Sequence, residues 1–517
     1  MSNKIYPIGI QNFEKIRNDG YFYIDKTALM YQMVKTGSYY FLSRPRRFGK
    51  SLLISTLEAY FQGKKELFEG LAVEKLEKDW IKHPILHLDL NIEKYDTPES
   101  LDKILNDNLE YWESQYGTRP SETSFSLRFA GIIQRACEKT GQRVVILVDE
   151  YDKPMLQAIG NEELQKQFRN TLKPFYGALK TKDGCIKFAL LTGVTKFGKI
   201  SVFSDLNNLD DISMWNEYVE ICGVSEHEIH ENLETELHEF AAARGITYDK
   251  LCEELRDCYD GYHFTHNSIG MYNPFSLLNA FKRKEFGSYW FETGTPTYLV
   301  KLLKKHHYDL ERMAHEETDA QVLNSIDSES TNPIPVIYQS GYLTIKGYDE
   351  RFGMYHLGFP NREVEEGFVR FLLPFYANVN KVESPFEIQK FVREVESGDY
   401  NSFFRRLQSF FADTTYEVIR DQELHYENVL FIVFKLVGFY VNVEYKTSDG
   451  RIDLVLQTDK FTYIMEFKLN GTAEEALRQI NDKHYALPFE MDGRKLFKIG
   501  VNFSAETRNI EKWIVES

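Results

Sequence analysis

The segment that most constrains the fold of this chain is the run Arg-Pro-Arg-Arg-Phe-Gly-Lys-Ser at residues 44–51. The apolar and aromatic residues 38–42 before it predict a buried strand, and the apolar residues 52–57 after it predict a helix. A loop between a strand and a helix presents backbone N–H groups that bind phosphate. We therefore expect Lys50 to reach the β- and γ-phosphates of a nucleotide, Ser51 to hold Mg²⁺, and Gly49 to let the backbone approach closely.

A second run, about a hundred residues later, supplies carboxylates. The five apolar residues 144–148 predict a buried parallel strand, which ends in Asp149 and Glu150. Asp149 is expected next to the Mg²⁺ ion, and Glu150 is expected to orient the attacking water. Either run alone fits an ordinary basic turn or a solvated strand end, but together they predict a nucleotide site.

Strand-like runs alternate with helix-length segments from residue 38 to about residue 200, which predicts a parallel sheet covered by helices. The other strands are expected at residues 85–90 and 186–191. Ligands bind at the carboxyl ends of such strands, where Asp89 and Thr192 also fall. Thr192 either senses the γ-phosphate or forms a strand-ending turn, and the same two interpretations apply to Asp89. Arg46 and Arg47 either contact phosphate, serve a neighbouring subunit or are solvated.

Composition excludes several classes. A chain of 517 residues is too long for one core, so two or three domains are expected. The formal net charge of −16 argues against a broadly basic nucleic-acid surface, so contacts with DNA or RNA must be local or run through metal ions. The five cysteines include no Cys-x-x-Cys pair, which favours a reducing cytoplasm over a disulfide framework or a zinc cluster.

No signal peptide or membrane span is expected. The N-terminal residues lack an apolar signal core. The apolar stretch 429–443 is too short for a bilayer and is interrupted by Lys435 and Gly438, so it predicts a buried helix running into a strand.

The middle of the chain carries weaker signals. Residues 222–286 are predicted to be helical and to form a lid over the nucleotide. Residues 337–345 have strand character, and residues 359–361 break the chain before another helical stretch.

A second constellation lies near the C-terminus. Residues 450–456 and 461–468 predict a hairpin in which Glu466 and Lys468 project to one face, a face that Asp453 shares. Two carboxylates and a lysine suit a Mg²⁺ site for phosphodiester hydrolysis, with Asp453 and Glu466 as ligands and Lys468 activating water. The alternative is a surface hairpin with a cross-strand Glu/Lys pair.

The order of the helices and strands around this hairpin favours the Mg²⁺ site over a plain surface hairpin. A helix at 423–436 and a strand at 439–445 precede the hairpin, and a helix at 473–485 carries Gln479 and Lys483 one turn apart, suited to contact phosphate. Glu423 and Glu444 either enter the site or are solvated.

The nucleotide constellation resembles a known family. Residues 44–51, the run Asp-Glu-Tyr-Asp-Lys-Pro at 149–154, and the phrases at 23–27 and 272–276 are similar to the bacterial AAA-ATPase-like P-loop family. The usual first glycine of the loop is replaced by Arg44, a departure that the family shares.

The second constellation looks like the PD-(D/E)XK nuclease domain that is commonly fused to these ATPases, matched at Asp453 and at Glu-Phe-Lys, residues 466–468. The resemblance implies a role for the helix glutamine, Gln479. The usual tyrosine four residues later is replaced by Lys483, with Tyr485 just beyond.

We therefore expect an α/β protein: a P-loop NTPase parallel sheet with a helical lid, and a smaller C-terminal α/β restriction-endonuclease-like domain. The expected parts are the ATPase core (1–222), the lid and connecting region (223–378) and the nuclease-like domain (379–517). The expected catalytic residues are Glu150, Asp453, Glu466, Lys468 and Gln479. The expected nucleotide-binding residues are Arg46, Arg47, Phe48, Gly49, Lys50, Ser51, Asp149 and Thr192. The expected metal ligands are Ser51, Asp149, Asp453 and Glu466.

The predicted function is that of a cytoplasmic ATPase, using ATP and Mg²⁺, whose nucleotide state controls a Mg²⁺-dependent nuclease. Its predicted partner is DNA or RNA and not a membrane, and a homo-oligomer is compatible with the sequence. One alternative is a regulatory NTPase switch with a non-cleaving nuclease-like domain. Another is a scaffold in which both sites are degenerate.

Overall fold

The computed structural model describes residues 3–196, 208–293, 297–324, 332–377, 379–380, 383–411, 422–448, 451–469, 471–490, 493–504, 506–507 and 509–517. Within these ranges, the side chains at 297–298, 314, 422–423, 445–448 and 451–453 are not described. The chain forms two compact units, the first made of residues 1–294 and 316–363 and the second of residues 295–315 and 364–517. The three-part division at residues 222 and 378 stays a prediction.

The first unit is built on a five-stranded parallel sheet with strand order β2-β3-β4-β1-β5. Its strands are β1 (Tyr39–Ser43), β2 (Ile85–Asp89), β3 (Val144–Asp149), β4 (Ile186–Gly193) and β5 (Asp210–Asp211). The four strands predicted from apolar runs are thus confirmed. The residues of β1, β3 and β4 are almost entirely buried, as expected for strands covered on both faces, whereas β2 alternates between buried and half-buried residues.

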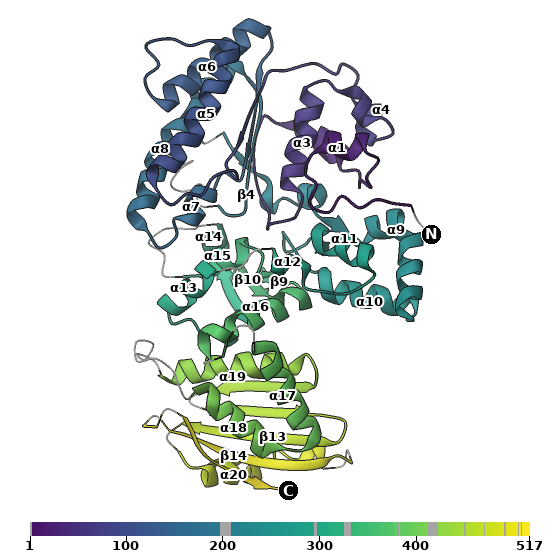
Figure 1. Cartoon of the computed structure of the whole chain (residues 1–517), viewed down its shortest axis with the longest axis vertical. Coiled ribbons are helices and arrows are strands. Elements are labelled where there is room, and N and C mark those ends of the chain that lie inside the picture. The colour runs from purple at the N-terminus through teal and green to yellow at the C-terminus, as the bar shows by residue number, and fades with distance from the viewer. Residues whose placement is uncertain are drawn as a thin grey trace. The chain divides into compact units, whose positions relative to one another are not determined.

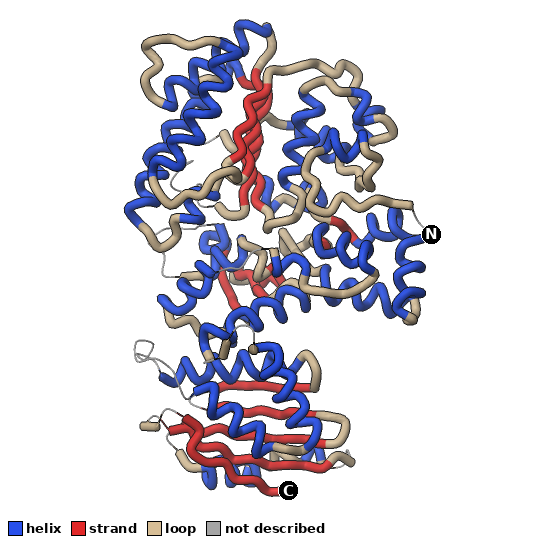
Figure 2. The backbone as a smooth tube through the Cα atoms, in the orientation of Figure 1, coloured by secondary structure: helices blue, strands red, loops and turns tan. Residues whose placement is uncertain are grey.

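Helices cover both faces of this sheet (Figures 1 and 2). On one side lie α5 (Pro98–Tyr116), α6 (Phe125–Thr140) and α8 (Glu162–Thr181), and on the other lie α1 (Phe13–Asn18), α3 (Lys50–Phe61) and α4 (Ala72–Leu76). The remaining helices of this part are α2 (Thr27–Thr36) and α7 (Lys153–Gln157). α3 begins at Lys50, within the segment 44–51, which we call the phosphate loop.

The rest of the first unit is largely helical, as predicted for residues 222–286. Its elements are β6 (Val224–Ser225), α9 (Glu226–Arg244), α10 (Tyr248–Tyr259), β7 (Met271–Tyr272), α11 (Pro274–Arg283), α12 (Tyr289–Glu292), α14 (Ala320–Asn324) and α15 (Ile334–Gln339). A three-stranded antiparallel sheet joins β8 (Glu316–Asp319), β9 (Thr344–Asp349) and β10 (Met354–Gly358) in the order β8-β10-β9.

The strand predicted at residues 337–345 is wrong for its first part. α15 ends at Gln339, a turn with Gly341 at φ 88° follows, and β9 begins only at Thr344. A short apolar run is compatible with either a helix or a strand, and here Pro335 lies at the first turn of a helix.

The second unit holds a mixed five-stranded sheet with strand order β11-β12-β13-β14-β15. Only β13 and β14 pair in parallel. The strands are β11 (Asn442–Ser448), β12 (Arg451–Gln457), β13 (Phe461–Leu469), β14 (Lys495–Ser504) and β15 (Asn509–Glu516). The predicted hairpin is confirmed, although residue 450 lies outside the described residues.

Helices pack on both faces of this sheet. The helices described in this unit are α13 (Thr297–Lys305), α16 (Arg362–Tyr376, whose first two residues belong to the first unit), α17 (Ser384–Ser397), α18 (Tyr400–Phe411), α19 (Gln422–Gly438) and α20 (Ala473–Asp482). Phe404 of α18 and Phe434 of α19 pack against Phe467 of β13, and Ile480 of α20 packs with Ile464. Successive residues of a strand point to opposite faces, so α20 covers the face that carries Glu466. In the described ranges, every helix is too short or too polar to span a bilayer.

One buried acid predicts an unusual pH dependence. Burial raises the pKa of Glu363 from 4.5 to about 7, although the N–H groups of Trp290 and Phe291 oppose this. Between these two values the folded chain keeps a proton that the unfolded chain has lost, so the free energy of unfolding falls as the pH rises through this window.

Glu363→Gln imitates the protonated acid. Unfolding in urea measures the free energy of unfolding of both proteins. The difference between Glu363→Gln and the wild type is expected to shift in favour of the variant by up to about 3 kcal/mol between about pH 5 and about pH 8. Parallel pH profiles of the two proteins would contradict this assignment.

Candidate nucleotide and nuclease-like sites

The phosphate loop follows β1, as predicted. Residues with positive and negative φ angles alternate in its second half. Arg47 and Gly49 have positive φ angles of 65° and 97°. Left-handed residues within a turn direct successive N–H groups into an anion-binding concavity. For a non-glycine residue such as Arg47 this conformation costs about 1–3 kcal/mol, a strain that clusters at functional sites.

Lys50 is held over the loop at the start of α3. Its side chain is only 3% exposed, and Nζ donates to the carbonyl oxygens of Arg44 (3.1 Å) and Pro45 (3.3 Å). Nζ also lies 3.4 Å from the Glu150 carboxylate. The two halves of the predicted nucleotide site therefore meet in space.

The carboxyl ends of the strands bring the predicted acids together. Asp149 pairs in register with Asp89, and its Oδ1 accepts hydrogen bonds from the Thr192 hydroxyl (2.6 Å) and the Glu150 N–H (3.1 Å). Burial raises the pKa of Asp89, and the nearby charges of Asp149 and Glu150 add to this. A bound cation would offset the repulsion between these carboxylates.

Asp152 was not predicted as a site residue. It is fully buried, and its carboxylate accepts hydrogen bonds from the N–H groups of Val194 (3.2 Å) and Thr195 (2.6 Å) and from the Thr195 hydroxyl (2.5 Å). Burial, reinforced by the charge of Glu150, raises the pKa of Asp152 to about 7. Asp152 thus fixes the segment after β4 to the segment after β3. The run of three acids within residues 149–152 was the available signal.

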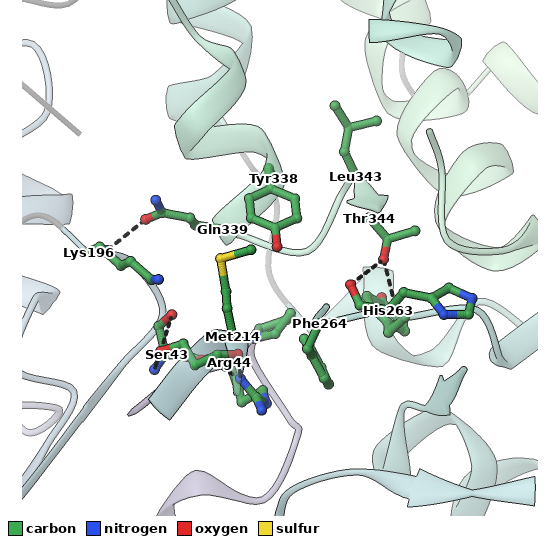
Figure 3. Close-up of a pocket in the computed structure, with 13 residues that line it drawn as sticks. Ser43, Arg44, Lys196, Met214, His263, Phe264, Tyr338, Gln339, Leu343 and Thr344 are labelled. Carbon is green, nitrogen blue, oxygen red and sulfur yellow. Dashed lines mark hydrogen bonds between the residues drawn. The ribbon is translucent and has the colours of Figure 1, made fainter. Parts of the chain in front are cut away.

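Arg44 occupies the position of the missing first glycine. Its side chain is buried and bonds backbone carbonyl oxygens of this chain. It is 1% exposed, lies 3.9 Å from the centre of the Phe264 ring, and donates to the carbonyl oxygens of Ser43 (2.9 Å), Ser213 (2.7 Å) and Tyr218 (3.1 Å). Figure 3 shows Arg44 at a cavity of about 30 Å³, together with Phe264, Tyr338 and Gln339. Burial lowers the pKa of Arg44 to about 10.

Residues 46–48 of the loop contact aromatic side chains. Arg46 donates from Nη2 to the Tyr342 hydroxyl (3.0 Å), and Arg47 lies over the Phe275 ring at 5.0 Å. Phe48 is buried against the rings of Tyr262 and Phe264. The nucleotide-binding roles of these three residues stay predictions, and for Phe48 they concern the backbone.

An apolar cavity of about 110 Å³ adjoins the phosphate loop at Gly49. It is lined by residues from several segments that lie far apart in sequence, among them Tyr23, Ile24, Leu53, Val224 and Leu278. Residues 23–24 belong to one of the phrases that carried the family resemblance.

In the second unit, the predicted nuclease residues converge. Glu466 is 1% exposed, and its carboxylate lies 3.2 Å from Lys468 Nζ. Lys468 Nζ donates to Gln479 Oε1 on α20 at 2.6 Å. Among the described residues, the buried Gln479 Nε2 has no hydrogen-bond partner. This amide is available for a ligand or water at the site.

Asp453 lies opposite Glu466 in the hairpin, as expected if the two residues share a face of the sheet. Its backbone pairs directly with Glu466 on one side and with Lys446 on the other. The side chains of Asp453 and Glu423 lie outside the described residues, and within the described residues no group of three metal-binding side chains occurs. Glu444 lines a separate cavity of about 610 Å³ beside Lys435 and Phe439.

Gly500 determines how closely α20 approaches the sheet. It pairs with Glu466, and a Cβ at this position would lie 2.1 Å from the Ala473 carbonyl oxygen and 2.5 Å from the Leu477 nitrogen. Any larger residue must therefore displace the α20 backbone, which carries Gln479.

We expect Gly500→Ala to destabilise the second unit by about 1–3 kcal/mol and to separate Gln479 from Lys468. Thermal unfolding and Mg²⁺-dependent cleavage measure the two effects. Gly438→Ala is the matched control, because its Cβ would meet Val443 at an ordinary 3.6 Å. Unchanged stability and cleavage in Gly500→Ala would contradict this role.

Comparison with known proteins agrees with this architecture. Residues 7–203 match the family described as predicted AAA-ATPase, and residues 421–513 match the PD-(D/E)XK nuclease superfamily. An Azotobacter chroococcum mcd 1 protein, described as an uncharacterized protein in the vnfD 5′ region, is 35% identical over 533 residues, covering 100% of both chains. The chain belongs to this family of AAA-ATPase-like proteins with a C-terminal PD-(D/E)XK domain.

Family membership accounts for the two units as an NTPase-type module and a nuclease-type module. Among solved structures, the Aeropyrum pernix ORC2 protein (ADPNP-ADP complexes) matches 70% of this chain and 92% of its own, with 10% identity and a TM-score of 0.23. The predicted resemblance to a fused ATPase and nuclease is thus confirmed by the family matches.

Proposed function

We propose that this protein binds and hydrolyses ATP and that its nucleotide state controls a Mg²⁺-dependent phosphodiesterase acting on DNA or RNA. The observation that carries the ATPase half is the meeting of Lys50 with Glu150 over the phosphate loop. The nuclease half rests on the convergence of Glu466, Lys468 and Gln479 from a strand and a helix.

In the nucleotide site, the phosphates of ATP would lie on the phosphate loop, where Lys50 exchanges its carbonyl partners for phosphate oxygens. Ser51 and Asp149 would hold Mg²⁺, which neutralises charge that develops on the phosphates. Thr192 orients Asp149, and Glu150 orients the attacking water. The base would occupy the apolar cavity at Gly49.

In the nuclease-like site, Asp453 and Glu466 would hold Mg²⁺, which polarises the phosphodiester and lowers the pKa of a bound water. Lys468 stabilises the negative charge that develops on the phosphate, and Gln479 fixes the Lys468 ammonium by accepting its hydrogen bond. The substrate binds through local contacts, because the net charge of −16 repels nucleic acid elsewhere.

Two further assignments complete the proposal. We place the protein in the cytoplasm, where its five free cysteines stay reduced. A homo-oligomer would allow Arg47, which lies on the exposed side of the loop, to serve a neighbouring subunit.

The alternative is a regulatory NTPase switch whose nuclease-like domain binds a partner or nucleic acid without cutting. The acidic balance of the chain favours this alternative. A scaffold without either activity is disfavoured by the intact charged residues of both sites.

The test is cleavage of labelled single- and double-stranded DNA and RNA by the purified full chain with Mg²⁺, with and without ATP. Cleavage that responds to ATP and is lost in Asp453→Asn supports the coupled nuclease. ATP hydrolysis without any cleavage supports the regulatory switch, and the absence of both overturns the proposal.

A further inference from the structure

We propose that Trp290 is a positioning residue for the phosphate loop: its indole N–H orients the peptide between Arg46 and Arg47, and Glu363 holds Trp290 in place. This inference rests on the proposed ATP site. It concerns residues that lie outside both matched segments and far from the loop in sequence.

The indole makes a direct contact with the loop backbone. Trp290 is 1% exposed, and its Nε1–H donates to the Arg46 carbonyl oxygen at 2.9 Å. The same oxygen accepts a longer hydrogen bond of 3.4 Å from Asn273 Nδ2. The Trp290 ring also lies 5.9 Å from the Arg46 guanidinium and 5.3 Å from the Tyr342 ring.

The adjoining turn packs on the loop as well. A Cβ at Gly341 would lie 2.6 Å from Pro45 Cβ, and Tyr342 accepts the hydrogen bond from Arg46. Trp290, Tyr342 and Gly341 therefore support the same two residues of the loop, Pro45 and Arg46.

Because the peptide group is planar, this contact also fixes the direction of an N–H group that can donate to a phosphate oxygen. In a trans peptide the C=O of one residue and the N–H of the next point in opposite directions. When Trp290 fixes the Arg46 carbonyl, it fixes the Arg47 N–H on the opposite side. The Gly223 N–H bonds the Phe48 carbonyl at 3.0 Å and fixes the Gly49 N–H by the same geometry.

Glu363 anchors the tryptophan from behind. Its Oε1 accepts a hydrogen bond from the Trp290 backbone N–H at 2.6 Å, and the Glu363 side chain is buried. Glu363 lies in the first turn of α16. Trp290 and Glu363 both belong to the first unit, and the buried carboxylate fixes the backbone from which the indole reaches the loop.

The test is steady-state ATP hydrolysis by the full chain carrying Trp290→Phe, which keeps an aromatic ring and removes the N–H donor. A lost N–H orientation weakens ground state and transition state alike, so we expect KM for MgATP to rise about tenfold with kcat almost unchanged. Trp513→Phe is the matched control, because it removes an indole hydrogen bond of 3.0 Å to Asn401 in the second unit.

A second pair of variants covers the case in which Trp290→Phe does not fold. Glu363→Ala removes the acceptor and should raise KM in the same way, whereas Glu363→Gln keeps Oε1 and should restore a KM near that of the wild type. A purely packing role predicts the same KM in Glu363→Ala and Glu363→Gln, whatever their unfolding temperatures.

The outcomes separate this inference from the proposed function. A wild type that neither binds a fluorescent ATP analogue nor hydrolyses ATP overturns both. A wild type that hydrolyses ATP, with unchanged KM in Trp290→Phe or, where that variant is unfolded, in Glu363→Ala, overturns the positioning role alone.

Discussion

Glu466→Ala is expected to abolish nucleic-acid cleavage and to leave ATP hydrolysis unchanged. Glu466 is 1% exposed and lies 3.2 Å from Lys468 Nζ. Its removal takes away a proposed Mg²⁺ ligand and leaves the Lys468 charge without this partner. Losing such a ligand removes both the positioned water and the charge stabilisation, so we expect a loss of at least about 100-fold.

The measurement is cleavage of labelled DNA and RNA beside ATP hydrolysis, with Mg²⁺ binding followed by calorimetry. The matched control is Glu516→Gln, because Glu516 pairs with Lys498 at the same 3.2 Å on the same sheet but is half exposed. Glu466→Gln preserves the volume of the buried side chain if Glu466→Ala is unstable. Wild-type cleavage in a folded Glu466 variant would place the active site elsewhere.

Lys50→Ala is expected to lower ATP hydrolysis by at least about 100-fold, because a buried ammonium directed at the transferred phosphate is a major source of charge stabilisation. Lys50 Nζ lies 3.4 Å from the Glu150 carboxylate and donates to the carbonyl oxygens of Arg44 and Pro45. Steady-state release of phosphate with Mg²⁺ measures the effect.

Lys64→Ala is the control for Lys50→Ala, since Lys64 makes a surface ion pair with Glu14 in the same unit. If the nucleotide state controls cleavage, Lys50→Ala should also remove the response of cleavage to ATP while the nuclease-like site stays intact. Hydrolysis at the wild-type rate in Lys50→Ala would refute the assignment of the phosphate loop.

The elements around both sites could be predicted because their signals are local. Apolar runs such as residues 144–148 are long enough to define a buried strand, and the spacing of Glu466 and Lys468 places them on one face of β13. The contact between Lys468 and Gln479 follows from the strand and the helix that succeeds it in sequence.

Other features depend on contacts between distant segments and have no local signal. Trp290 is 244 residues from Arg46 in sequence, and nothing near it indicates a bond to the phosphate loop. The burial of Arg44 could not be predicted either, because its partners Ser213 and Tyr218 come from a later segment. The strand predicted at residues 337–345 was wrong for its first part, because a short apolar run is compatible with both a helix and a strand.

The path of the chain between its two units has a consequence for how the modules can be separated. The chain passes from one unit to the other after residues 294, 315 and 363. Residues 379–517 alone would lack Tyr308 and Leu310, whose backbone groups bond the buried Asn428 side chain at 3.0 and 2.8 Å. Neither unit is one continuous stretch of the chain, so exchanging a single gene segment cannot replace one unit and leave the other complete. The two units are therefore expected to be inherited together.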